Sequence, residues 1–367
     1  MEQQKEQLLK IAGNFVAEDC ITELEAHGNG HINDTFLVVC KEDGIEKKII
    51  LQKINKTVFP NPEKVMENVV GVTSFLAQKI AQMGGNPERE TLTIIPAKDG
   101  KAYYVGEDGE YWRSYIFIQD TICLDAAESV EDFYESAVIF GKFQSMLADY
   151  PADTLHETIV NFHNTKARFA VFQEAVAKDV KGRAKNVQKE IQFVLDREAV
   201  ASFFVNLLMQ KALPLRVTHN DTKINNILLD RETRKGCVID LDTVMPGLAA
   251  YDFGDSIRFG ASTAAEDETD LSKVSCSMEL FEAYTKGFIE GCGGRLTQKE
   301  IELLPMGAKV ITLECGMRFL TDYLNGDVYF KIHRDGHNLD RCRTQFKLVA
   351  DMEEKWQQMQ DIVAKYA

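Results

Sequence analysis

One segment of the chain combines a histidine, an aspartate and an asparagine at a spacing that suits phosphoryl transfer. His219, Asp221 and Asn226 form the pattern H-x-D-x-x-x-x-N. In such a pattern a carboxylate can orient and deprotonate an acceptor hydroxyl, and an amide oxygen can bind Mg²⁺. Asp240 follows at the end of a short apolar run and offers the hard oxygen ligand that Mg²⁺ prefers. Asp242 lies two residues further on, on the same face of an extended strand, and is a second metal-ligand candidate.

Rigid elements must position this loop. Strands are predicted at Leu213–Val217 before it, at Ile227–Leu229 after it and at Cys237–Ile239. Asp and Asn most often cap ordinary turns, but the strand-loop-strand context favours a catalytic loop. Lys223, two residues after the candidate base, could neutralise the phosphate in transit.

A glycine-containing turn near the N-terminus is a candidate phosphate-binding flap. Gly28, Asn29 and Gly30 separate predicted strands at Ile21–Glu25 and Thr35–Cys40. The backbone N–H groups of such a turn can approach phosphates closely. The sequence therefore predicts a strand-turn-strand flap that contributes to nucleotide binding.

The third predicted strand, Lys48–Ile54, should carry a cation for the phosphates. Lys53 is the candidate, but a shift of one residue would turn Gln52 inward instead. After this strand, Asn61 and Pro62 mark the start of a helix that should run to Met83.

The rest of the chain alternates between a few strands and many helices. An apolar strand is predicted at Trp112–Ile118, and Ser129 should cap a helix with Asp132 at its third position. Further helical patterns occupy 165–177, 185–211, 278–289, 298–324 and 346–366. Asp252 and Asp255 are expected to cap helices or to support the catalytic loop rather than to bind metal.

Composition excludes several classes of protein. The 367 residues suffice for two lobes with sizeable cores. A net charge of −15 argues against a nucleic-acid surface. The eight cysteines form no C-x-x-C pair and are expected to be free thiols in a reducing compartment. Without a signal-peptide core or an apolar run long enough to span a bilayer, the protein is expected to be cytoplasmic, with no membrane partner.

These motifs resemble those of the aminoglycoside phosphotransferase and choline kinase superfamily, relatives of the protein kinases. More narrowly, the chain resembles the N-acetylhexosamine 1-kinases, which phosphorylate sugars at the anomeric hydroxyl. The strings that carry the resemblance are THNDTKINN at 218–226, VIDLDTVMPG at 238–247 and YDFGDSIR at 251–258, together with GNGHINDTF, LQKIN and RFLTDYL.

The resemblance implies an α+β, two-lobed, protein-kinase-like fold. A small β-rich lobe at 1–118 would bind the nucleotide, and a larger, mostly helical lobe at 119–367 would carry catalysis and sugar binding. ATP and Mg²⁺ are the implied cofactors. The strand at 112–118 would lead into the hinge, where Tyr115, Phe117 and Ile118 would meet the adenine through their backbone groups.

The resemblance also implies the sugar contacts. His31, Arg318 and Tyr329 would bind the sugar, and Asp221 would hold its 1-hydroxyl, so that the product is the sugar 1-phosphate. The sequence does not distinguish N-acetylglucosamine from N-acetylgalactosamine, and it leaves the oligomeric state open.

Two other functions fit parts of the same pattern. Another kinase of the superfamily could use an aminoglycoside, choline or homoserine as its acceptor. Choline generally requires an aromatic cage, whereas a polycationic aminoglycoside would suit the acidic chain. A non-catalytic nucleotide-binding module is disfavoured because Asp221, Asn226 and Asp240 are all intact. A protein kinase is disfavoured because no D-F-G stands at the metal position and no A-P-E follows.

Overall fold

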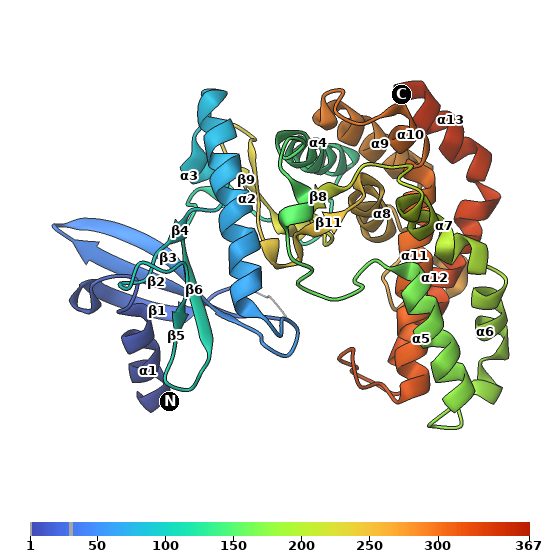
Figure 1. The fold of residues 1–367 in the computed structure, drawn as a ribbon, viewed down its shortest axis with the longest axis horizontal. Helices are drawn as coiled ribbons and strands as arrows, with labels where there is room; N and C mark the ends of the chain where they lie inside the picture. Colours follow the sequence, from blue (N-terminus) through green and yellow to red (C-terminus); the bar gives the residue numbers. More distant parts are fainter. Residues whose placement is uncertain (1, 29–31) are drawn as a thin grey trace. The chain divides into compact units, whose positions relative to one another are not determined.

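The computed structural model describes residues 2–28 and 32–367, drawn as a ribbon in Figure 1. The chain divides into two compact units that interleave along the sequence. The first comprises Met1–Ile122, Thr154–Ile159 and Leu228–Met245; the second comprises Cys123–Asp153, Val160–Ile227 and Pro246–Ala367.

A six-stranded antiparallel sheet forms the centre of the first unit. Its strands run in the order β1-β2-β3-β6-β4, and β5 also pairs with β6. The β2–β3 hairpin turns at Asp43 and Gly44, which both have positive φ, 50° and 82°, as an Asp-Gly hairpin turn requires. The strands are β1 Ile21–Ala26, β2 Asp34–Glu42, β3 Ile45–Ile54, β4 Ile94–Ile95, β5 Tyr104–Val105 and β6 Tyr111–Ile116.

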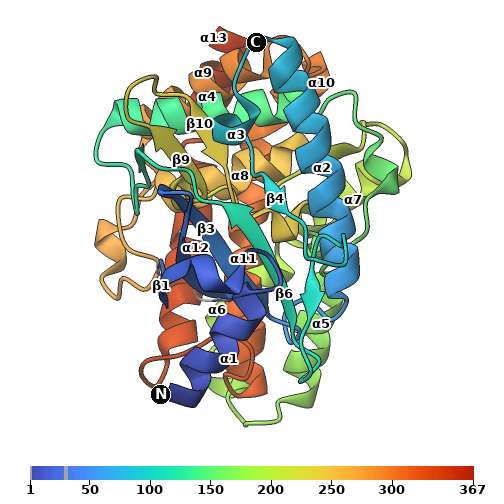
Figure 2. The ribbon, with the colours of Figure 1, turned by 90° about the vertical axis from the view of Figure 1, so that its left-hand side faces the viewer.

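Helices lie on both sides of this sheet. The helix α1, Glu2–Ala12, packs Ile11 and Ala12 against the apolar side chains of Val38 and Leu51. Figures 1 and 2 show α2, Pro62–Gln82, alongside the sheet on the side away from α1. The predicted start of α2 is confirmed, although the Asn61 side chain makes no capping hydrogen bond. The helix buries an apolar stripe of Val65, Val69, Val72, Leu76 and Ile80.

A smaller sheet in the first unit leads into the segment that contains Asp240 and Asp242. Its strands, β7 Thr121–Ile122, β9 Ile227–Asp230 and β10 Gly236–Val238, run in the order β10-β9-β7. The short helix α3, Pro87–Glu90, is tied to this sheet through an Arg89–Asp230 ion pair. Asp240 therefore follows directly from an anchored strand.

The second unit is mainly helical. Its longest helix, α11, contacts α5, α8 and α12. The capping of α4 by Ser129 is confirmed, because the Ser129 hydroxyl accepts from the Asp132 N–H at 3.1 Å. The helices are α4 Val130–Met146, α5 Thr165–Lys178, α6 Gln188–Leu195, α7 Glu198–Met209, α8 Ala249–Gly260, α9 Met278–Cys292, α10 Gln298–Glu302, α11 Leu304–Asn325, α12 His337–Glu354 and α13 Trp356–Tyr366; β8 Arg216–Thr218 pairs with β11 Met245–Gly247.

Three predicted helices are interrupted. The pattern at 298–324 divides into α10 and α11, because Pro305 has no N–H with which to continue the hydrogen bonding of α10. The pattern at 185–211 divides at Arg197, whose guanidinium bonds Glu353. The pattern at 346–366 divides at Lys355, whose ammonium bonds the Ser275 hydroxyl and the Cys276 carbonyl. Periodicity cannot predict these tertiary anchors.

Candidate active site

The loop between β8 and β9 is fastened to helix α8 by two carboxylates. Asp252 accepts from the backbone N–H groups of His219 at 3.0 Å and Asn220 at 2.8 Å. Asp255 accepts from the Thr222 N–H at 3.0 Å. Asp252 lies in the first turn of α8 and Asp255 further along it, and the N-cap position is Leu248. The expected support of the loop is therefore confirmed, and the expected helix capping is wrong.

His219 acts as a buried scaffold for the same loop. Its side chain is fully enclosed, with the rings of Phe140 and Phe143 at centroid distances of 5.6 and 6.0 Å. Its Nδ1 accepts from the Asp221 N–H at 3.3 Å. The next residue, Asn220, has a φ of 66°, a left-handed conformation that Asn adopts more readily than most residues. The imidazole thus holds the loop in shape and is enclosed away from solvent.

Asp221, Lys223 and Asn226 form one hydrogen-bonded group. Lys223 Nζ lies 2.7 Å from Asp221 Oδ1. Asn226 Nδ2 donates to Asp221 Oδ2 at 3.1 Å and to the Asp221 carbonyl at 2.8 Å. The Asp221 side chain is 27% exposed, so its carboxylate is fixed in direction and still open to a hydroxyl group.

Electrostatics keep this carboxylate ionised. Burial opposes ionisation, but the Lys223 ammonium and the hydrogen bond from Asn226 outweigh it, so the pKa of Asp221 is lowered below its usual value. For Lys223, burial favours the neutral amine, but the carboxylates of Asp221 and Asp255 raise its pKa above the usual value. The pair therefore carries one negative and one positive charge at neutral pH.

Two side chains have the chemistry to hold Mg²⁺. The Asn226 amide nitrogen is committed to Asp221, which leaves the amide oxygen as its ligand atom. Asp240 is exposed and has a φ of 56°, a left-handed conformation that turns the chain sharply after β10. An amide oxygen and an exposed carboxylate are each the kind of oxygen ligand that Mg²⁺ accepts.

Asp242 is placed differently from Asp240. Its carboxylate is 1% exposed and forms an ion pair with the equally buried Arg113. Its other oxygen accepts from Asn33 Nδ2 at 2.7 Å, and its backbone carbonyl accepts from the Thr158 hydroxyl at 2.8 Å. Both carboxylate oxygens of Asp242 are therefore already engaged by side chains of the protein.

Arg113 is the residue that sequence reasoning missed. Its guanidinium also donates to Gln52 Oε1 at 3.0 and 2.7 Å and lies 5.2 Å from the centroid of the Tyr115 ring. The available signal was an arginine within the otherwise apolar strand β6, because such a charge must find a buried partner.

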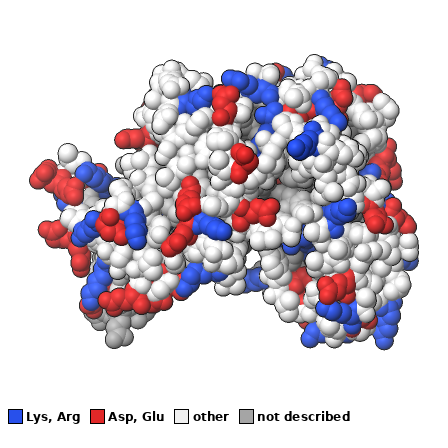
Figure 3. Space-filling view, in the orientation of Figure 1, with Lys and Arg blue, Asp and Glu red and all other residues white. Residues whose placement is uncertain are grey.

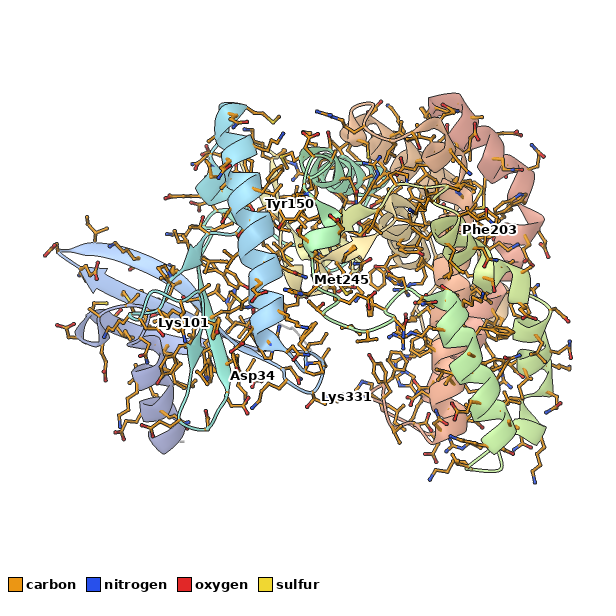
Figure 4. The ribbon with its side chains drawn as sticks, viewed as in Figure 1. Asp34, Lys101, Tyr150, Phe203, Met245 and Lys331 are labelled. Carbon is orange, nitrogen blue, oxygen red and sulfur yellow. The ribbon has the colours of Figure 1, made fainter. Side chains whose placement is uncertain are left out.

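Gln52 and Lys53, the two candidates on the third strand for a contact with the phosphates, have different partners. Gln52 faces Arg113, whereas Lys53 lies on the other face and contacts Asp34 and Glu110, both at 3.8 Å. Figure 4 labels Asp34 at the start of β2. The structure thus does not bring Lys53 to the Arg113–Asp242 pair.

The structure describes the predicted hinge completely and the predicted flap in part. The Tyr115 side chain is buried, the Phe117 N–H donates to the Lys48 carbonyl at 3.0 Å, and the Ile118 carbonyl accepts from the Thr121 hydroxyl at 3.1 Å. In the predicted flap, Gly28 has a φ of 75°. Three candidate residues lie outside the described residues: Asn29, Gly30 and His31.

Arg318 and Tyr329 lie together in the second unit. The Arg318 guanidinium lies 5.8 Å from the centroid of the Tyr329 ring, 5.5 Å from that of Phe162 and 5.4 Å from that of Phe330. Tyr329 is 62% exposed, and Asp322 accepts from its backbone N–H at 2.8 Å. This arrangement presents a cation framed by aromatic rings, of which Tyr329 is the most open to a ligand.

Known proteins resemble this chain in part of its sequence and in its fold. Residues 93–274 match the model of the phosphotransferase enzyme family. The structure is similar to an aminoglycoside phosphotransferase from Alicyclobacillus acidocaldarius, with a TM-score of 0.61, 13% identity and 96% of each chain covered. It is also similar to a choline kinase from Cryptosporidium parvum, with a TM-score of 0.58, 15% identity and 98% and 97% of the two chains covered.

A third similar structure contains ligands. It is a spectinomycin phosphotransferase in complex with ADP and spectinomycin, with a TM-score of 0.53, 12% identity and 92% and 94% of the two chains covered. These likenesses confirm the predicted α+β fold of aminoglycoside phosphotransferases and choline kinases.

The family model covers residues 93–274, and the structural likenesses extend over nearly the whole chain and show its fold. Among residues 2–28 and 32–367, no helix has the length and apolar character needed to cross a membrane.

Proposed function

We propose that this protein is an ATP-dependent N-acetylhexosamine 1-kinase, which converts the sugar to its 1-phosphate. The observation that carries the proposal is the group formed by Asp221, Lys223 and Asn226, within sequence strings that resemble those of the anomeric sugar kinases. Arg318 and Tyr329, in the same unit, supply a guanidinium and an aromatic ring suited to sugar hydroxyls and a sugar face.

In the proposed reaction, Asp221 accepts a hydrogen bond from the anomeric hydroxyl and takes its proton as the oxygen bonds to the terminal phosphorus of ATP. ADP is the leaving group. A carboxylate with a lowered pKa is a weak base, so its main contribution is orientation and late proton acceptance. An anomeric hydroxyl is more acidic than a simple alcohol, which suits such a base.

Lys223 contacts the Asp221 carboxylate and holds it in direction, and it would offset the charge on the transferred phosphoryl group. Asn226 and Asp240 would hold Mg²⁺, which supplies charge neutralisation on the nucleotide phosphates. Asp242 and Arg113 would support Asp240 from behind rather than bind metal. Nucleotide contacts by Gly28, Asn29, Gly30, Tyr115, Phe117 and Ile118, and a sugar contact by His31, remain part of the proposal.

The aromatic group around Arg318 bears on the choline alternative. Phe162, Tyr329 and Phe330 could cage a quaternary ammonium ion, but the Arg318 guanidinium already lies against all three rings. A second cation there would be repelled. This observation favours a neutral sugar over choline or an aminoglycoside at that position.

An acceptor panel tests the proposal. The wild-type protein is incubated with ATP, Mg²⁺ and one of N-acetylglucosamine, N-acetylgalactosamine, choline, kanamycin or homoserine, and the products are followed by phosphorus NMR. We expect ADP formation with the two hexosamines and a product whose phosphorus couples to the anomeric proton. Turnover of choline, kanamycin or homoserine without turnover of either hexosamine would contradict it, and ATP binding without any turnover would favour a non-catalytic module.

A further inference from the structure

The second unit contains a cavity of about 290 Å³ directly beside the catalytic loop. Thr222, Lys223 and Ile224 form one wall of it, and Ala126 and Ala265, which are exposed, mark where it opens. Its volume is close to the roughly 300 Å³ at which small-molecule sites begin. The proposed catalytic residues do not fill this space.

One buried acceptor in the cavity has no partner. Gln345, on α12, lines the cavity and is 3% exposed. Its Oε1 is buried and accepts no hydrogen bond within residues 2–28 and 32–367. A buried carbonyl oxygen without a donor costs free energy, so such atoms in native proteins usually serve a ligand, a water or an ion. The amide therefore calls for an N–H or O–H donor from a molecule that enters the cavity.

The charges that line the cavity are already compensated. Arg258 bonds Asp255 Oδ1 at 3.0 Å and Glu266 Oε1 at 2.9 Å, and Lys223 pairs with Asp221. Much of the remaining lining is small or apolar, including Ala127, Ala264 and Leu280. Such a lining selects a neutral group that has a polar N–H and an apolar end.

We infer that this cavity receives the acetamido group of the acceptor sugar, with Gln345 Oε1 accepting the amide N–H and the acetyl methyl lying among the apolar side chains. The inference rests on the proposed function and deepens it. In an N-acetylhexosamine the acetamido carbon, C2, is bonded to the reacting carbon, C1. A sugar whose 1-hydroxyl meets Asp221 must therefore direct its C2 substituent close to the catalytic loop, where Lys223 joins the carboxylate to the cavity wall.

Sugar selectivity tests the inference. Steady-state kcat/KM is measured for N-acetylglucosamine and for glucose, which has a hydroxyl at C2, with wild-type protein and with Gln345→Met. Methionine keeps the approximate length of the side chain but has no amide acceptor. We expect the ratio of the two kcat/KM values to fall about tenfold in the variant, the loss expected for one hydrogen bond in a buried site. Gln357→Met, an exposed change on α13, is the matched control and should leave the ratio unchanged.

A second variant guards against misfolding of the first. Ala265→Phe adds bulk at the exposed mouth of the cavity, away from the core, and should raise the KM for N-acetylglucosamine more than that for glucose. A wild-type preference for the N-acetylated sugar that survives both variants would overturn the inference and leave the proposed function intact. Absence of turnover with any N-acetylhexosamine would instead overturn the proposed function, and this inference with it.

Discussion

At the scale of single residues, Asp221 is held from both sides. The Lys223 ammonium contacts one of its oxygens and the Asn226 amide contacts the other, while His219 binds its backbone N–H. A carboxylate restrained in this way loses little entropy when it binds an acceptor hydroxyl. Its contribution should therefore appear in the rate of transfer more than in the affinity for nucleotide.

Asp221→Asn should lower kcat by about 10²–10⁴, the range expected when a general base is lost. The Kd for ADP, measured by calorimetry, should change less than threefold, a bound of roughly 0.7 kcal/mol. Asn keeps the size of the side chain and can still accept a bond from Lys223, so the fold should persist. Near-normal kcat in this variant would remove Asp221 from the mechanism.

The lowered pKa of Asp221 predicts where activity is lost in acid. Because the folded-state pKa lies below the ordinary value, the ionised form persists as the pH falls and is lost only when the pH passes through that lowered pKa. Lys223→Met removes the main cause of the lowering, so the acid limb of the kcat/KM profile should move to higher pH. Lys178→Met, in an exposed pair with Glu174, is the control; an acid limb that moves equally in both variants would contradict the assignment.

The sequence pattern predicted that Asp221, Lys223 and Asn226 act together in one loop. The structure brings these three side chains into contact. These three lie within six positions of each other, so local chain geometry nearly dictates the contact. Arg113 and Asp242 are 129 positions apart, and no periodicity links them. An ion pair between such distant residues depends on how the strands that carry them are arranged in the fold, which a single sequence does not specify.

At the scale of elements, helix α8 both supports the loop and packs closely on α11. A Cβ added at Gly254 would lie 2.4 Å from the Gly307 carbonyl oxygen, and one at Gly307 would lie 2.2 Å from the Ala250 carbonyl oxygen. The two helices approach through backbone atoms at this crossing. The position of α8 in turn sets Asp252 and Asp255 against the catalytic loop.

Gly254→Ala should therefore destabilise the protein by about 1–3 kcal/mol, the usual cost of overpacking a core. In urea unfolding the midpoint should fall, and kcat should fall with it as α8 shifts beneath the loop. Val171→Ala, at an exposed position of α5, should change stability by no more than about 0.5 kcal/mol. If Gly254→Ala leaves both stability and kcat unchanged, the close crossing does not position the loop.

The predicted turns and helix ends are correct where local conformational preferences determine them, and wrong where tertiary contacts determine them. The Asp43-Gly44 hairpin and the Ser129 cap follow from the conformational preferences of those residues. The break at Lys355 follows instead from bonds to Ser275 and Cys276, about 80 positions away. The amphipathic pattern continues through Lys355, so the sequence predicts one helix where the structure has two.

At the scale of the whole molecule, long-range polar contacts return distant segments to the first unit. Asn68, on α2, donates to the His156 carbonyl at 2.8 Å and to the Val244 carbonyl at 2.9 Å. These bonds hold parts of 154–159 and 228–245 within a unit that is otherwise N-terminal. The α+β class was predicted from the family resemblance. The interleaving was not predicted, because nothing in the sequence marks Asn68 as the residue that binds these two distant segments.

The charge of the whole chain sets how an anionic nucleotide must be held. Net charge is −15, and on the face in Figure 3 basic and acidic side chains are interspersed over the described residues. The negative net charge opposes a general attraction for phosphates at neutral pH, so neutralisation is expected from individual cations and from Mg²⁺. Nucleotide binding should accordingly depend on divalent metal.

Thermal stability measured with ADP checks this dependence. With Mg²⁺ and ADP at about 100 times its Kd, binding should stabilise the folded protein by about 2.7 kcal/mol and raise its Tm. With EDTA in place of Mg²⁺, the same ADP concentration should raise Tm much less.

Two variants test the proposed metal ligands. Asp240→Ala and Asn226→Ala should each reduce the part of the Tm rise that depends on Mg²⁺, because each removes one oxygen ligand. Asp335 is an exposed carboxylate on the turn before α12, and Asp335→Ala is the control for loss of negative charge alone. This variant should keep the full Tm rise with Mg²⁺ and ADP. Equal Tm shifts with Mg²⁺ and with EDTA would mean that the protein neutralises the phosphates by itself, and the metal role of Asp240 and Asn226 would then be wrong.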